Sequence, residues 1–321
     1  IREAGATAAE ELAFTLADGF AYVEACMRRG LDVDDFVPRL SFFFDAHIDF
    51  FEEIGKFRAA RRIWARWMRD RYGAKSERSM KLRFHTQTAG VSLTAQQPEN
   101  NIVRTAIEAL AAVLGGTQSL HTNAMDEVFA LPTAKNAEVA LRTQQIIAEE
   151  TGVASTIDPL GGSWFVEEMT DRIEARAEEI FAAIDRMGNG SMLDGVLHGI
   201  DEGWFQSALA DSAYEFEKAL NTGDRVIVGV NKYAKDDEAS LEILRISAEV
   251  EAQQRAKLTR LRGERDNAAV TASLDTLRTG AQGDANLMEL IIDAARVRAT
   301  LGEIVNAMKD VFGGYREPPR V

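Results

Sequence analysis

The chain has 321 residues, of which 46% are hydrophobic and 27% charged, so it is long enough and apolar enough to bury a sizeable core. Its formal net charge of −14 argues against nucleic acid as a partner, because binding phosphates requires a basic surface. No apolar run approaches the roughly 20 residues that cross a bilayer. The single cysteine, Cys26, excludes an internal disulfide, which is compatible with a cytoplasmic protein.

Helical and β-rich segments alternate in the first half of the chain, which predicts an α/β fold. Helices are expected at residues 8–30, 51–72, 101–114 and 133–151, and strands at 36–44, 80–86 and 117–122. This spacing is typical of βαβ units with parallel strands. Three strands cannot close a barrel of eight, so the sheet is either open or part of a (β/α)8 TIM barrel whose other strands lie elsewhere.

The character of the sequence changes near Asp158. A turn-rich DPLGGSWF segment leads into a charged helix at 169–187, and 225–230 is a possible short strand. From Ser240 the pattern is almost entirely helical, with a capping box at Thr300 and Glu303. We therefore expect two regions, 1–157 and 158–321, the second mostly helical.

Two polar segments follow or overlap predicted strands, HTQTAGVSLTAQQPENN and GGTQSLHTNAMDEVFALPT. Ligands of parallel α/β folds bind at the carboxyl ends of the strands. The alternative is that these side chains only cap helices and bond loop backbone, with Asn100 or Asn101 as an N-cap. The candidates are His85, Thr86, Gln87, Gln118, Ser119, His121, Thr122, Asn123 and Glu127.

Other chemistry is poorly supported by the residues. The four histidines form no close pair and no HExxH motif, so a metal site is not expected. No GxSxG motif or phosphate-binding glycine loop is present. The basic helix from Lys56 to Arg71 is interpreted as a solvated or subunit-facing surface, with the steering of ligand phosphates as the alternative. Arg39, within an apolar segment predicted to be a strand, must either form an internal ion pair or clamp a phosphate or carboxylate.

Several long motifs resemble the methylmalonyl-CoA mutase family. They are REAGAT, PRLSFFF, the block from HTQTAG to HTNAMDE, ALPT and DPLGGSWFVE. The resemblance implies the C-terminal part of the TIM-barrel domain of a large subunit, lacking the first part of the barrel and followed by a mostly helical extension.

The resemblance also implies roles for individual residues. The family's catalytic histidine would precede Ile1, so no catalytic residue is expected within the chain. The predicted CoA-binding residues are Arg39, Leu40, Ser41, Gln118 and Ser119. The predicted cofactor-binding residues are Glu3, His85, Gln87, Glu127, Ala130 and Leu131. We expect Arg39, Gln87 and Glu127 to converge at one mouth, beneath a flat corrin.

The implied activity is an adenosylcobalamin-dependent radical rearrangement of a branched acyl-CoA, of the methylmalonyl, isobutyryl or 2-hydroxyisobutyryl type. Val91 stands where methylmalonyl-specific enzymes have tryptophan, which is similar to two-subunit mutases with a separate small B12-binding subunit. The family's DxHxxG cobalt motif has only a coincidental near match at Asp45–His47, where Phe50 replaces glycine. The alternative is a catalytically silent subunit that supports an active partner.

Overall fold

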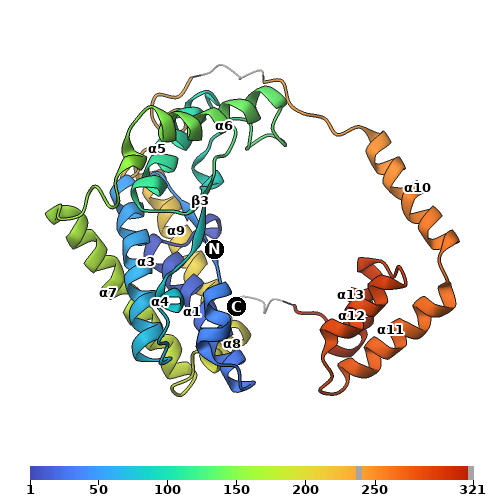
Figure 1. Cartoon of the computed structure of the whole chain (residues 1–321). Coiled ribbons are helices and arrows are strands. Elements are labelled where there is room, and N and C mark those ends of the chain that lie inside the picture. Colours follow the sequence, from blue (N-terminus) through green and yellow to red (C-terminus); the bar gives the residue numbers. More distant parts are fainter. Residues whose placement is uncertain (236–240, 317–321) are drawn as a thin grey trace. The chain divides into compact units, whose positions relative to one another are not determined.

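The structure is a computed structural model that describes residues 1–235 and 241–316 (Figure 1). It divides into two compact units, Ile1–Leu244 and Arg245–Pro319. The change of character expected near Asp158 falls inside the first unit. Within the described ranges, no helix has both the length and the hydropathy that a membrane span requires.

The first unit contains a three-stranded parallel sheet. The strands β1 (Phe42–Ala46), β2 (Phe84–Thr88) and β3 (Ser119–His121) lie side by side in the order β1-β2-β3. Helix α3 (Phe50–Asp70) joins the first pair and α5 (Asn100–Leu114) joins the second. Crossovers between neighbouring parallel strands have the same handedness. The helices therefore lie on one face of the sheet, as in a (β/α)8 barrel. The predicted α/β class and three parallel strands are confirmed.

The bounds of all three strands differ from the prediction, and β3 is shorter at both ends than the expected 117–122. The segment before β1 forms α2 (Val33–Phe36) and the 3-10 turn η2 (Val37–Arg39), since Pro38 favours a helical turn there. Helix α4 (Glu77–Met80) likewise precedes β2. The possible strand at 225–230 is a turn with one isolated bridge between Val228 and Lys232.

The remaining helices of the first unit follow the hydrophobic periodicity of the sequence. Thr7 and Glu10 form a capping box on α1, and Gly30, at φ +83°, follows its end. These elements are η1 (Arg2–Ala4), α1 (Ala8–Arg28), η3 (Gly90–Ser92), α6 (Ala134–Glu149), η4 (Val153–Ser155), α7 (Trp164–Met187), α8 (Met192–Asp201) and α9 (Trp204–Thr222).

The core lies between the sheet and the surrounding helices. Phe44 of β1 and Phe84 of β2 pack on Phe57 of α3. Phe20 of α1 stacks on Trp64 of α3, and helix α7 packs against both α1 and α3. One face of each strand is therefore buried by helices.

The basic side of α3 is not only solvated, as predicted, but also contacts α7 and the segment before it: Arg62 and Arg66 are 44% and 39% exposed, whereas Arg58 is 12% exposed. The Glu174 carboxylate bridges Arg62 and Arg66, and Arg58 pairs with Asp158 and Glu167. The packing of α3 on α7 brings these arginine charges next to the acidic side of α7.

The second unit is helical. Its helices are α10 (Ala248–Glu264), α11 (Asn267–Ala281), α12 (Leu287–Arg296) and α13 (Leu301–Phe312). Leu277, Ala294 and Ala307 are fully buried where α11, α12 and α13 meet. The predicted capping box of Thr300 and Glu303 is confirmed at the start of α13.

Candidate functional site

The face of the sheet that the helices leave open carries two cross-strand rows of side chains. One row is Phe43, His85 and Ser119. His85 Nδ1 lies 2.7 Å from Ser119 Oγ, and the rings of Phe43 and His85 are 5.3 Å apart. Phe43 is 51% exposed, whereas the strand residues on the other face are mostly buried. The sheet therefore presents aromatic and polar groups on an accessible surface.

The second row is Asp45, Gln87 and His121, nearer the carboxyl ends of the strands. Gln87 is half-buried and His121 is exposed. Asp45 is buried, and burial next to Glu11 raises the pKa of its carboxyl to about 7. This row brings the predicted cofactor residue Gln87 to the carboxyl edge of the sheet.

Two further predicted cofactor residues, Glu3 and Glu127, meet around Gly90 at that edge. Glu3 Oε1 accepts a hydrogen bond from Gly90 N at 2.7 Å. A Cβ atom added to Gly90 would lie 3.0 Å from Glu3 Oε1, 3.0 Å from Asn123 Nδ2 and 3.8 Å from Glu127 Cγ. Partial burial raises the pKa of the Glu127 carboxyl. Glycine at position 90 therefore allows Glu3 and Asn123 to approach its backbone closely.

The amide of Asn123 is the unusual member of this cluster. It is 2% exposed, and neither its oxygen nor its nitrogen has a hydrogen-bond partner among the described residues. A buried amide without partners is costly, so it marks a place where a ligand group or water is needed. The sequence names Asn123 only as one polar residue after a strand; its burial is what singles it out.

A buried ionic network lies beneath the cluster. Lys56 is fully buried and pairs with both Glu11 and Glu53, while its Nζ donates to Asp45 O at 2.6 Å. Arg2 pairs with Glu53 at 3.3 Å. Since Arg2 precedes Glu3, this network anchors the segment that carries Glu3.

The predicted CoA residues lie at the opposite edge of the sheet. Arg39, Leu40 and Ser41 precede β1, and Gln118 precedes β3. Arg39 is exposed, so the argument that its charge is buried within a strand is wrong. The expectation that Arg39 shares one mouth with Gln87 and Glu127 is also wrong, because the amino ends of parallel strands lie at the other edge.

The Gln118 side chain is held by backbone groups. Its Oε1 accepts from Phe84 N at 2.8 Å, and its Nε2 donates to Gly116 O at 2.8 Å. This places Gln118 at the amino edge, not at the carboxyl edge that the sequence pattern suggested. Ser119, by contrast, faces the open surface beside His85.

The family model described as methylmalonyl-CoA mutase matches residues 1–314. The chain belongs to the methylmalonyl-CoA mutase family. A protein named 2-hydroxyisobutanoyl-CoA mutase large subunit, from Aquincola tertiaricarbonis, is 46% identical over 321 residues, covering 99% of this chain and 56% of the relative. A probable mitochondrial methylmalonyl-CoA mutase from Caenorhabditis elegans is 47% identical over 316 residues, covering 98% and 42%. Methylmalonyl-CoA mutase from Escherichia coli (strain K12) is 46% identical over 317 residues, covering 98% and 43%. The chain thus spans about half the length of these curated relatives.

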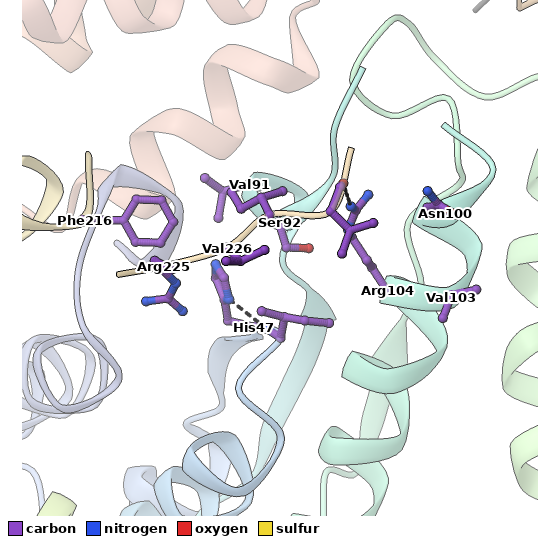
Figure 2. A pocket seen from close by; sticks show the side chains of 12 residues that line it. His47, Val91, Ser92, Asn100, Val103, Arg104, Phe216, Arg225 and Val226 are labelled. Carbon is purple, nitrogen blue, oxygen red and sulfur yellow. Dashed lines mark hydrogen bonds between the residues drawn. The ribbon is translucent and has the colours of Figure 1, made fainter. Parts of the chain in front are cut away.

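In this member of the methylmalonyl-CoA mutase family, Val91 lines a cavity of about 320 Å³ next to the Gly90 cluster (Figure 2). His47 and Arg104 lie on one side of this cavity, and Phe216 and Arg225 come from α9 and the segment after it. Burial, together with the positive charge of Arg2, Arg225 and Lys56, lowers the pKa of His47 to about 3.

Asp45 and His47, the near match to the cobalt motif, lie in the interior. His47 is 6% exposed, and its Nδ1 accepts a hydrogen bond from Ile48 N at 2.7 Å. Among the described residues, no group of three His, Cys, Asp or Glu side chains is arranged to hold a metal ion.

Proposed function

We propose that this chain forms part of the acyl-CoA-binding barrel of an adenosylcobalamin-dependent acyl-CoA mutase. The observation that carries the proposal is the close polar cluster of Glu3, Gly90, Asn123 and Glu127 at the carboxyl edge of a parallel sheet. Membership of the mutase family supports the reaction class, an intramolecular rearrangement of a branched acyl-CoA.

The residues at the carboxyl edge fit one face of a corrin with its adenosyl group. The unpartnered amide of Asn123 and the carboxylates of Glu3 and Glu127 offer donors and acceptors to a polar nucleoside. Leu131 is 59% exposed beside the half-buried Ala130, so together they offer an apolar surface to a macrocycle. When bound there, adenosylcobalamin supplies the radical chemistry. The chain's own residues bind, orient and exclude water.

The acyl-CoA would run along the open face of the sheet. Arg39 and Ser41 are exposed at the amino edge, where a guanidinium suits a phosphate group. Strand β1 places about 16 Å between the two edges, at roughly 3.3 Å per residue. A long thioester can therefore contact Arg39 at one end and lie near Gln87 with its acyl group. His85 and Ser119 would line its path.

A separate small subunit is the proposed source of the cobalt ligand. His47 is buried and already accepts a backbone hydrogen bond, so it is unsuited to that role. The Aquincola relative is named a large subunit, which supports a hetero-oligomer of two kinds of chain. Cys26 is a free cysteine, which is compatible with a cytoplasmic location.

The rival proposal is a catalytically silent subunit that supports an active partner. A silent subunit has no need of a close polar cluster around Gly90 or an unpartnered amide at Asn123. These features favour an active mutase.

The deciding experiment combines the full-length subunit that contains this chain with its B12-binding partner, adenosylcobalamin and a panel of branched acyl-CoAs. We expect one of these substrates to be isomerised. Arg39→Ala should raise the KM for acyl-CoA about tenfold, the loss of one charge-assisted contact. Arg29→Ala, also exposed but at the end of α1, is the matched control. No turnover of any substrate would favour the silent subunit.

A further inference from the structure

The side chain of Asn101, in the first turn of α5, joins two loops of the candidate site. Asn101 Oδ1 accepts from Thr94 N at 3.0 Å, and Nδ2 donates to Thr94 O at 2.9 Å. The same Nδ2 donates to Met125 O at 3.1 Å. Thr94 follows the η3 turn that carries Gly90, and Met125 lies two residues before Glu127. Asn101 is therefore not the N-cap that the sequence suggested.

Arg104, one turn later on α5, extends this connection. Its Nη1 donates to Asn101 Oδ1 at 2.8 Å and to Thr94 Oγ1 at 3.0 Å. Its Nη2 donates to Val228 O at 2.7 Å. Figure 2 shows Arg104 beside the residues of the cavity wall. The turn after α9 is thus connected to the Glu127 loop through two side chains of α5.

The four hydrogen bonds of Asn101 use both donors and both acceptor positions of its amide. The residue is fully buried, and three of its four partners are backbone groups, each of which would lose this hydrogen bond if the amide were removed. Aspartate would keep the acceptors and lose both donors. Alanine would lose all four bonds. Position 101 therefore requires an amide side chain, whereas an N-cap position also accepts Ser, Thr or Asp.

We propose that Asn101 and Arg104 are positioning residues that hold the Gly90 and Glu127 loops at a fixed separation, and that the turn at 226–228 completes this support. The expected effect of these two residues on cofactor binding rests on the proposed function. The hydrogen bonds themselves belong to this chain alone, so the positioning role has a readout without any cofactor.

The first test is amide hydrogen exchange on the full-length subunit without cofactor. Asn101→Ala should speed exchange in both loops, 89–97 and 122–131, while the sheet and α1 keep their protection. Asn101→Asp should loosen mainly 122–131, because it keeps the acceptor for Thr94 N. Arg104→Met should loosen 226–230 and the Thr94 loop. Thr105→Val is the matched control, since Thr105 is 2% exposed on the same helix and its hydroxyl has no partner among the described residues.

The second test measures the Kd for adenosylcobalamin and the KM for acyl-CoA in the complete complex. Asn101→Ala should raise this Kd about tenfold. The KM should stay unchanged, because Arg39 lies at the other edge of the sheet. Thr105→Val should change neither value.

Wild-type exchange rates in both loops of Asn101→Ala would overturn the proposal, and so would an equal increase throughout the sheet, which would mean general destabilisation. If the exchange pattern is as expected but the wild-type complex isomerises no acyl-CoA, the proposed function fails and the positioning role stands. If the wild-type complex is active and the loops of the variant are undisturbed, the positioning role fails and the proposed function stands.

Discussion

Glu3 Oε1 accepts a hydrogen bond from Gly90 N at 2.7 Å, although 87 residues separate the two positions. The bond ties the N-terminal segment to the loop after β2 at the carboxyl edge of the sheet. It closes the cluster that also contains Asn123 and Glu127. Glu3 follows Arg2, which is held by the buried ionic network of Glu53, Lys56 and Glu11.

Replacing Gly90 with alanine should disturb this cluster. The added Cβ would lie 3.0 Å from both Glu3 Oε1 and Asn123 Nδ2, so one of them must move. We expect a loss of about 1–3 kcal/mol in the free energy of unfolding, and weaker binding of adenosylcobalamin by the complete complex. Urea denaturation and equilibrium dialysis measure the two effects. Gly283→Ala, in the turn after α11 and with no atom within 4 Å of the new Cβ, is the control and should change neither.

Lys56→Met should be strongly destabilising, because it leaves the carboxylate of Glu11 in the core without its cation and leaves Glu53 with Arg2 alone. The expected cost is roughly 3–5 kcal/mol in the free energy of unfolding. Adding Glu53→Gln should recover part of it, since one buried negative charge is removed. Lys218→Met, which removes a surface pair with Glu215, is the control for losing a lysine. Equal effects of the two lysine substitutions in chemical denaturation would contradict the buried network.

Glu108 should make stability depend on pH. It is fully buried, and burial raises the pKa of its carboxyl to about 9. Because its pKa is about 4.3 in an unfolded chain, the folded state holds the proton more tightly, and this contribution to stability is lost as pH rises from about 4 towards 9. Between pH 5 and pH 7 the loss is roughly 3 kcal/mol.

Glu108→Gln keeps the shape of the protonated acid and cannot ionise, so it should be more stable than the wild type at pH 8 and similar at pH 4.5. Urea denaturation across this range gives the difference between the two proteins, in which the contribution of Asp45 cancels. Glu99→Gln, an exposed change just before α5, should leave the wild-type pH profile in place. Parallel profiles for wild type and Glu108→Gln would show that Glu108 is ionised in the folded protein.

The bridge from Glu174 to Arg62 and Arg66 should hold α7 on α3. The Glu174 side chain is only 12% exposed, so Glu174→Ala should cost about 1–2 kcal/mol, more than a surface pair. Glu179→Ala on the same helix removes one exposed pair with Arg176 and should cost less than about 0.5 kcal/mol. If thermal unfolding places the two variants within error of each other, the bridge adds nothing beyond a surface contact.

The sequence by itself determined the α/β class, the three parallel strands and most helices, because alternating hydrophobic periodicity and caps such as Thr7 and Thr300 act over a few residues. It also indicated the family, since long motifs such as the HTQTAG block lie in continuous stretches. It predicted Glu3, Gln87 and Glu127 as cofactor residues, and the fold brings all three to one edge of the sheet.

Only the tertiary structure decided which partner each polar group has. Arg39 lies at the opposite edge from Gln87, the arginines of α3 face carboxylates of α7, and Asn101 bonds two loops instead of capping its helix. These pairings join residues far apart in the chain, and their strength depends on burial and direction, which a local pattern of residue types does not contain.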